Sequence, residues 1–196
     1  MKKLLFIIFV LFAYTSCDDE PMIKPDANFI FDKGNTQIAG TTVTASNLST
    51  SADTYNWTDD KGLFLTTKDF SHKYEYSGTY QITLTAINGE YTDTHTETLT
   101  IKDPTLRIRV QQNGNLVANC YVAIYNNYDN WINSNPDYEG YTDNTGIYEK
   151  EIPAGTYYYD AGYIDDAGIG WYNSDYQLTV VAGQEVTEIT TILVSN

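Results

Sequence analysis

Hydrophobic and polar residues alternate along most of the chain in short runs. The clearest run extends from Tyr80 to Ala86, where Tyr80, Ile82 and Leu84 are separated by polar residues. A period of two is typical of a half-buried β-strand. Gly, Asn, Asp and Pro separate the runs, and no stretch of useful length carries apolar residues at helical spacing. The pattern therefore predicts an all-β protein.

The alternation breaks at Pro104, which follows a polar pair and ends a strand. This break separates two modules at residues 28–103 and 104–196. The modules follow an amino-terminal signal segment at residues 1–16 and a tether at 17–27, which are described below. The modules are within the usual size range of small domains. We expect two consecutive antiparallel β-sandwiches.

The first module has a buried aromatic residue and a hairpin as its clearest features. Trp57 is expected to plug the core, and Asn88-Gly89 is expected to form a type I′ turn between two strands. This module resembles the polycystic kidney disease (PKD) domain, an immunoglobulin-like β-sandwich. The resemblance rests on the order of Trp57, His72, Tyr74, Gly78 and Tyr80. It implies that His72 is structural rather than catalytic.

The second module combines turn residues with an aromatic strand. Asp143 and Gly146 are expected to form a turn, and Tyr157, Tyr159 and Ala161 alternate toward a core. This module resembles the carboxypeptidase regulatory-like and collagen-adhesin B-type families, which are transthyretin-like sandwiches. The residues that carry the resemblance are Thr142, Asp143, Gly146, Tyr148, Pro153, Gly155 and Tyr157.

The amino-terminal segment has the order of a secretory signal. Lys2 and Lys3 precede an apolar run at residues 4–13, and small polar residues then lead into Cys17. The run is half the roughly 20 residues that a transmembrane helix needs. The segment resembles the lipobox of bacterial lipoproteins, which implies that Cys17 is acylated and anchors the chain in a membrane. The acids at 18–20 resemble the surface-export signal of Bacteroidota lipoproteins, which implies an outer-membrane location facing the cell exterior.

The composition is strongly acidic, with a formal net charge of -15 over 196 residues. Nucleic-acid binding needs a concentrated basic patch, so we expect no nucleic-acid partner. Arg107 and Arg109 alternate with apolar residues and are expected on the wet face of a strand. Cys120 alternates inward with its neighbours and is expected to be a buried, inert thiol.

Catalytic signatures are missing from the sequence: it has no nucleophile elbow, no His-Glu-x-x-His and no phosphate-binding glycine loop. Asp165 and Asp166 are adjacent, so on a strand they would point to opposite faces, which argues against a glycosidase pair. We therefore expect that the protein is not an enzyme and that it has no cofactor and no metal site. Calcium stays open as an alternative because the loops are rich in Asn and Asp, although none has EF-hand spacing.

Two interpretations of function remain. The chain is either a surface binding or adhesion module for a glycan or a protein, or a structural spacer in an outer-membrane assembly. The candidate contact residues lie in loops at the two ends of the second module. They are Asp143, Asn144, Asp165, Asp166, Trp171 and Tyr172 at the end far from the linker, and Tyr128 and Trp131 in a loop near it. If every connection is a hairpin, these loops lie at opposite ends of the sandwich, so we expect no composite site.

Overall fold

The structure is a computed structural model that describes residues 23–164, 167–168, 170–173 and 176–194. The predicted signal segment, the lipidation site Cys17 and the beginning of the tether lie outside the described residues. The candidate residues Asp165 and Asp166 do so as well. Strands account for nearly all regular structure, so the predicted all-β fold class is confirmed.

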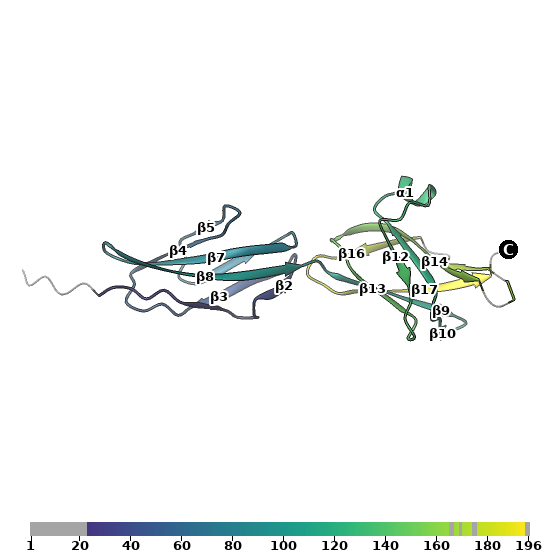
Figure 1. Cartoon of the computed structure of the whole chain (residues 1–196), viewed down its shortest axis with the longest axis horizontal. Coiled ribbons are helices and arrows are strands. Elements are labelled where there is room, and N and C mark those ends of the chain that lie inside the picture. Colours follow the sequence, from purple (N-terminus) through teal and green to yellow (C-terminus); the bar gives the residue numbers. More distant parts are fainter. Residues whose placement is uncertain (1–22, 165–166, 169, 174–175, 195–196) are drawn as a thin grey trace, which may run out of the picture.

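The first half of the chain, residues 23–103, forms a two-layered sandwich (Figure 1). Its strands are β1 (Phe29–Phe31), β2 (Thr36–Ile38), β3 (Thr42–Asn47), β4 (Thr54–Thr58), β5 (Phe64–Leu65), β6 (Phe70–Lys73), β7 (Gly78–Asn88) and β8 (Tyr91–Lys102). One sheet has the order β1-β3-β6, and the other has the order β2-β8-β7-β4-β5.

The core of this half lies between the two sheets. Trp57 is fully buried there, as expected, and its indole N–H donates to the carbonyl of Thr67 at 3.0 Å. Phe29 and Phe70 contact the Trp57 ring edge-on or tilted, with centroids 5.0 and 5.4 Å away. Phe29 and Phe70 belong to the three-stranded sheet, and Ile82 and Leu84 of β7 close the core beside Trp57 from the five-stranded sheet. The alternation read from the sequence thus marks the inward positions correctly.

The hairpin between β7 and β8 differs from the expected type I′ turn at Asn88-Gly89. Asn88 pairs with Tyr91, so the two central residues are Gly89 and Glu90. Gly89 has a φ of 57°, whereas Glu90 is not in the left-handed region. A single positive φ at the first central position is the requirement of a type II′ turn, which glycine meets.

The second half, residues 104–194, is built from nine strands and one short helix within its described part. They are β9 (Thr105–Gln112), β10 (Asn115–Leu116), β11 (Tyr121–Tyr125), α1 (Tyr128–Ile132), β12 (Tyr138–Tyr141), β13 (Ile147–Glu151), β14 (Gly155–Ile164), β15 (Gly170–Asn173), β16 (Gln177–Val180) and β17 (Val186–Val194).

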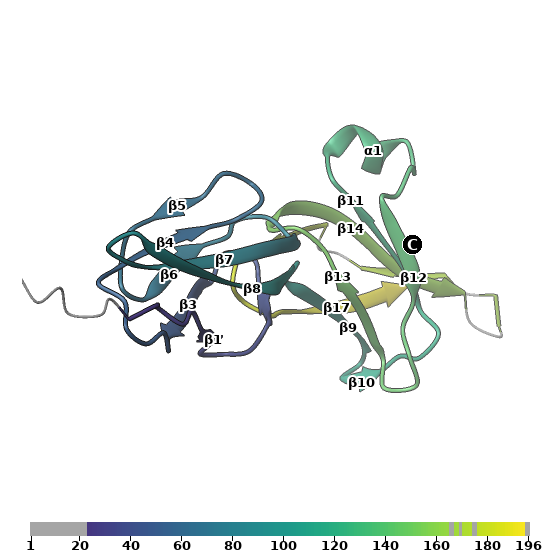
Figure 2. The same cartoon turned by 60° about the vertical axis from the view of Figure 1, so that its left-hand side comes forward.

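These strands form one continuous sheet that folds over a second core (Figure 2). Its order is β10-β9-β17-β15-β14-β11-β12, with β13 paired to β9 and β16 paired to β14. Leu106, Ile108 and Val110 of β9 face inward from one layer, and Tyr157 and Tyr159 of β14 from the other. This core shares no residue with the core of the first half.

Two strand pairs differ from the antiparallel arrangement that we expected. β2 runs parallel to β8, and β9 runs parallel to β17. In each half these pairs join a strand from the beginning of the half to its last strand. A parallel neighbour requires a long crossover, which the intervening strands supply.

One edge of strand β14 pairs with two strands in succession, β15 and β16. Gly162 pairs with Tyr172 of β15, and Tyr158 pairs with Gln177 of β16, so the register shifts by one residue between the two pairs. At this shift the buried Asn173 side chain accepts a hydrogen bond from the Ala161 amide at 2.8 Å. The side chain thus replaces a backbone partner that the irregularity removes.

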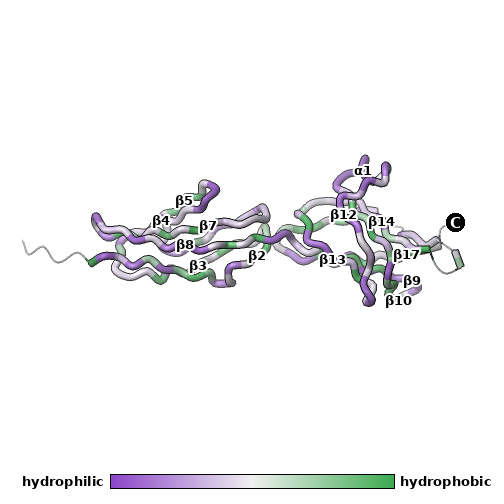
Figure 3. Tube along the Cα trace, in the orientation of Figure 1, coloured by the Kyte–Doolittle hydropathy of each residue, from purple (hydrophilic) through white to green (hydrophobic). Residues whose placement is uncertain are grey.

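The helix α1 is a single turn within the connection between β11 and β12. Its N-cap is Asn127, whose side chain accepts from the Asn130 amide at 2.8 Å. The tube in Figure 3 shows this connection as a mostly hydrophilic segment. The described residues include no helix that is long and apolar enough to span a bilayer.

Two further expectations for the second half concern Cys120 and the arginines of β9. Cys120 is fully buried, as expected, and burial raises the pKa of its thiol to about 11, which leaves it unreactive near neutral pH. Arg107 lies on the outer face, where its guanidinium contacts Glu149 and Glu185 at 2.6 Å each.

The two halves lie end to end and meet at a close backbone contact (Figure 1). The amide of Gly183 donates to the carbonyl of Ala39 at 2.7 Å. A Cβ atom on Gly40 would come within 2.4 Å of the Ala182 Cβ, so the two halves touch at a position where only glycine fits. Lys102 and Glu151 form an ion pair of 3.0 Å across the same junction.

This contact predicts different effects for two glycines with similar backbones. Gly40 and Gly34 have φ values of 85° and 77°, but a Cβ on Gly34 would meet nothing within 4 Å. Gly40→Ala is expected to lower the free energy of unfolding by about 1–3 kcal/mol more than Gly34→Ala, since it adds a steric clash to the same backbone strain. Denaturant unfolding measures the difference. Equal losses would show that the junction contributes nothing.

Candidate functional site

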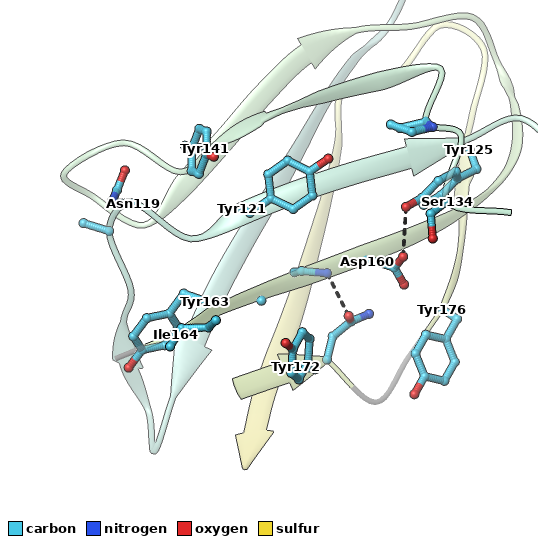
Figure 4. A pocket seen from close by; sticks show the side chains of 15 residues that line it. Asn119, Tyr121, Tyr125, Ser134, Tyr141, Asp160, Tyr163, Ile164, Tyr172 and Tyr176 are labelled. Carbon is cyan, nitrogen blue, oxygen red and sulfur yellow. Dashed lines mark hydrogen bonds between the residues drawn. The ribbon is translucent and has the colours of Figure 1, made fainter. Parts of the chain in front are cut away.

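An open groove of about 1130 Å³ lies on the outer face of the second half, over strands β12, β11, β14 and β15 (Figure 4). Its walls come from the sheet itself and from the connection that holds α1. The described residues that line it are Ala118, Asn119, Tyr121, Tyr125, Ser134, Pro136, Tyr141, Asp160, Ala161, Gly162, Tyr163, Ile164, Tyr172, Asn173 and Tyr176.

The floor of the groove follows from strand register. Tyr121 pairs with Tyr141 on one side and with Gly162 on the other, and Gly162 pairs with Tyr172. Paired residues of adjacent strands lie on the same face of a sheet. Three tyrosines therefore form a row across four strands, with Gly162 between two of them. The rings of Tyr121 and Tyr141 are in contact, with centroids 5.6 Å apart.

Two glycines allow the ring of Tyr172 to lie against the sheet. A Cβ atom on Gly162 would come within 2.7 Å of one ring edge, and a Cβ on Gly170 within 2.9 Å of the other. No side chain lifts the ring away from the strands, and 51% of the Tyr172 surface remains exposed. Tyr172 therefore presents an aromatic surface to the groove.

Two carboxylates lie in the next row, separated by the small residue Ala123. Glu139 pairs with Ala123, which pairs with Asp160. Glu139 accepts a hydrogen bond from the Tyr121 hydroxyl, and burial together with this carboxylate raises the pKa of Tyr121 to about 12. Asp160 accepts from the hydroxyl of Tyr125 at 3.0 Å. Burial and the Asp160 carboxylate raise the pKa of Tyr125 still further above its ordinary value, so both phenols stay protonated.

An aromatic cluster around α1 forms one end of the site. Trp131 stacks on Tyr158 with centroids 5.6 Å apart and an interplanar angle of 16°, and it contacts Tyr176 at 5.1 Å. Its indole N–H donates to Asp160 at 2.8 Å. Tyr128 contacts both Trp131 and Tyr158. Asp160 thus ties the α1 connection to the sheet.

Some of the predicted site residues lie at the groove and others do not. Tyr172 lines the groove, and Tyr128 and Trp131 belong to the cluster beside it. Trp171 does not face the groove but packs against the second core. Asp143 and Asn144 are exposed in another turn, where the Asp143 carboxylate accepts hydrogen bonds from Thr145 and Ile147 that lower its pKa.

The expectation that the two candidate loops could not contribute to one site is corrected by the groove. Ser134 and Pro136 from the α1 connection line it together with Tyr172 and Ile164. Ser134 and Pro136 thus lie on the same face of the sheet as Ile164 of β14 and Tyr172 of β15, and outward side chains of β11 and β14 continue the site between them. The assignment of loops to alternate ends of the sandwich considers only the ends and leaves out the outer face of the sheet, where the groove lies.

Sequence reasoning missed Asp160, Tyr121, Tyr141, Tyr158 and Tyr176. Two of them have a signal in the sequence: Tyr158 and Asp160 alternate with the inward residues of β14 and must face outward. The sequence does not show which outward positions lie on neighbouring strands, and that adjacency creates the groove.

The lining of the groove is rich in aromatic rings and hydrogen-bonding groups. Among its described lining residues there is no His, Cys, Lys or Arg, and Asp160 is the single carboxylate. The described part of the chain holds no cluster of three or more His, Cys, Asp or Glu side chains that could bind a metal ion. Aromatic rings, hydroxyls, amides and carboxylate acceptors remain, which fix and orient a ligand.

No family model and no curated protein matches the chain. Solved structures give distant likenesses. The Bacillus anthracis TIE protein aligns with 85% of this chain and 40% of its own length, at 12% identity and a TM-score of 0.37. A carbohydrate-binding module from the β-sandwich superfamily aligns with 79% of this chain and 59% of its own length, at 13% identity and 0.39.

A third likeness is to the pilus 2b backbone protein of group B streptococcus, which aligns with 84% of this chain and 96% of its own length at 13% identity and a TM-score of 0.39. The chain thus spans less than two thirds of the first two structures. At these TM-scores the likenesses assign neither a function nor a site. The resemblances to PKD and transthyretin-like families stay predictions.

The double role of Asp160 predicts a specific effect on Trp131. Asp160→Ala removes the acceptor of both the Trp131 indole and the Tyr125 hydroxyl. We expect a loss of about 1–3 kcal/mol in the free energy of unfolding and easier acrylamide quenching of tryptophan fluorescence, because buried donors lose their partner. Asp160→Asn keeps one carbonyl oxygen for the indole and is the control. Similar quenching in the two variants would contradict this role.

Proposed function

We propose that this protein is a non-catalytic binding module that holds a glycan in the groove. The observation that carries the proposal is the row of Tyr141, Tyr121 and Tyr172 on an open face, beside the carboxylates of Asp160 and Glu139. An aromatic ring has an electronegative face, against which the C–H face of a sugar packs. Carboxylate and amide oxygens accept hydrogen bonds from sugar hydroxyls.

The size and openness of the groove favour an extended ligand. Its volume of about 1130 Å³ exceeds the range of about 300–1,000 Å³ that is usual for small-molecule pockets. It extends from Asn119 and Ile164 to Ser134 and Tyr176, along strands β11 and β14. A chain of several sugar units fits such a shape better than a single compact molecule.

The proposal includes display at a cell surface through a lipid on Cys17. The lipobox-like segment and the acids at 18–20 support it. The purple beginning of the described chain lies at the end of the first half that faces away from the second half (Figure 1). A membrane anchor before residue 23 would therefore hold the groove away from the lipid.

The alternative, a structural spacer, is supported by the end-to-end junction at Gly40 and Gly183. The two functions are compatible, because the first half can act as the spacer for a groove in the second. The exposed aromatic row favours binding, since a spacer has no need of a tyrosine that lies open on two glycines.

Binding is tested with the purified full-length protein on an array of neutral, amino-bearing and acidic oligosaccharides, followed by calorimetry. Tyr172→Ala is expected to weaken binding about tenfold or more, which corresponds to about 1.4 kcal/mol, because it removes the stacking surface. Tyr76→Ala is the control, since Tyr76 is 80% exposed but lies in the first half. Binding that survives Tyr172→Ala unchanged would refute the groove as the site.

The anchor is tested separately by Cys17→Ala. Each methylene that enters the bilayer contributes about 0.8 kcal/mol, so removal of the acylated thiol is expected to release the protein from the membrane fraction. Detergent-phase partitioning and mass spectrometry of the mature amino terminus measure this. Cys120→Ala is the control, because Cys120 is buried in the second core. An unmodified thiol at Cys17 would disprove the anchor.

A further inference from the structure

The groove has an unbalanced charge. Asp160 lines it, and Glu139 lies beside it on the outer face of β12, where it accepts from the Tyr121 hydroxyl. The described lining residues include no Lys or Arg to compensate. The chain as a whole carries 26 acids against 11 basic residues, so the surrounding potential has the same sign.

The hydrogen bonds at Asp160 keep this charge in place. Its two oxygens accept from the Trp131 indole and the Tyr125 hydroxyl, so the carboxylate is held between the aromatic cluster and the tyrosine row. A ligand that contacts both aromatic regions therefore has to pass this carboxylate. Neutral hydroxyls can donate to its remaining lone pairs, whereas a second carboxylate or a sulfate cannot.

We infer that Asp160 and Glu139 select glycans by charge: the groove accepts uncharged or amino-bearing chains and rejects chains with uronic acid, sialic acid or sulfate groups. This inference rests on the proposed function and adds the ligand class. Amino groups are accepted for two reasons, since a cation is attracted both to a carboxylate and to the face of a tyrosine ring.

The test uses two derivatives of one neutral oligosaccharide that binds. The carboxymethylated form is compared with its uncharged carbamoylmethyl analogue, which matches it in size and serves as the neutral form. The full-length protein is expected to bind the carboxymethylated form on the order of tenfold more weakly, which is the scale of repulsion between partly solvated charges in one groove. Salt is expected to reduce the difference, because the Debye length falls to about 3 Å at 1 M.

The decisive variant is the double substitution Asp160→Asn and Glu139→Gln, which keeps the size of both side chains. It is expected to restore binding of the carboxymethylated form to within about threefold of the neutral form. The control is Asp53→Asn with Glu90→Gln, because these exposed acids of the first half change the net charge by the same amount. Thermal melts confirm that both variants are folded.

The outcomes separate the two proposals. Equal binding of neutral and carboxymethylated chains, or equal effects of the two double variants, overturns the charge selection and leaves glycan binding intact. If no glycan of any charge binds, or if a protein alone occupies the groove, glycan binding itself is refuted and the selection with it.

Discussion

The alternation of side chains along β14 is the constraint on which the second half depends. Tyr157, Tyr159 and Ala161 point into the core, so the positions that alternate with them along β14 must face outward. Those positions include Asp160 and Gly162, which form the middle of the groove. One strand thus stabilises the sandwich with one face and builds the candidate site with the other.

This arrangement links the stability of the site to the register of the sheet. The register shift between β15 and β16 is accommodated by the buried amide of Asn173, and the pairing of Gly162 with Tyr172 places an aromatic ring over a strand that lacks a side chain. A slip of one residue would exchange the inner and outer faces of the strand. The core therefore fixes the position of each groove residue.

The α1 connection contributes shape rather than a separate site. A single helical turn is too short to be stable alone, and Trp131 attaches it to the sheet by stacking on Tyr158 and by donating to Asp160. The tryptophan thereby becomes a support for the end of the groove. Trp171, the other tryptophan of this half, packs against the core. The exposed aromatic surface comes from tyrosines, whose hydroxyls remain satisfied near water.

The sequence alone determined the all-β class, the inward positions of β7 and β14, and the turns at glycines, because these depend on local periodicity and backbone preference. It placed the β7–β8 turn one residue early and took all strand pairs as antiparallel. Only the tertiary structure decided that Tyr121, Tyr141 and Tyr172 lie side by side and that Asp160 receives the Trp131 indole. Such neighbours are set by pairing between distant strands, which a repeat of two along one strand cannot specify.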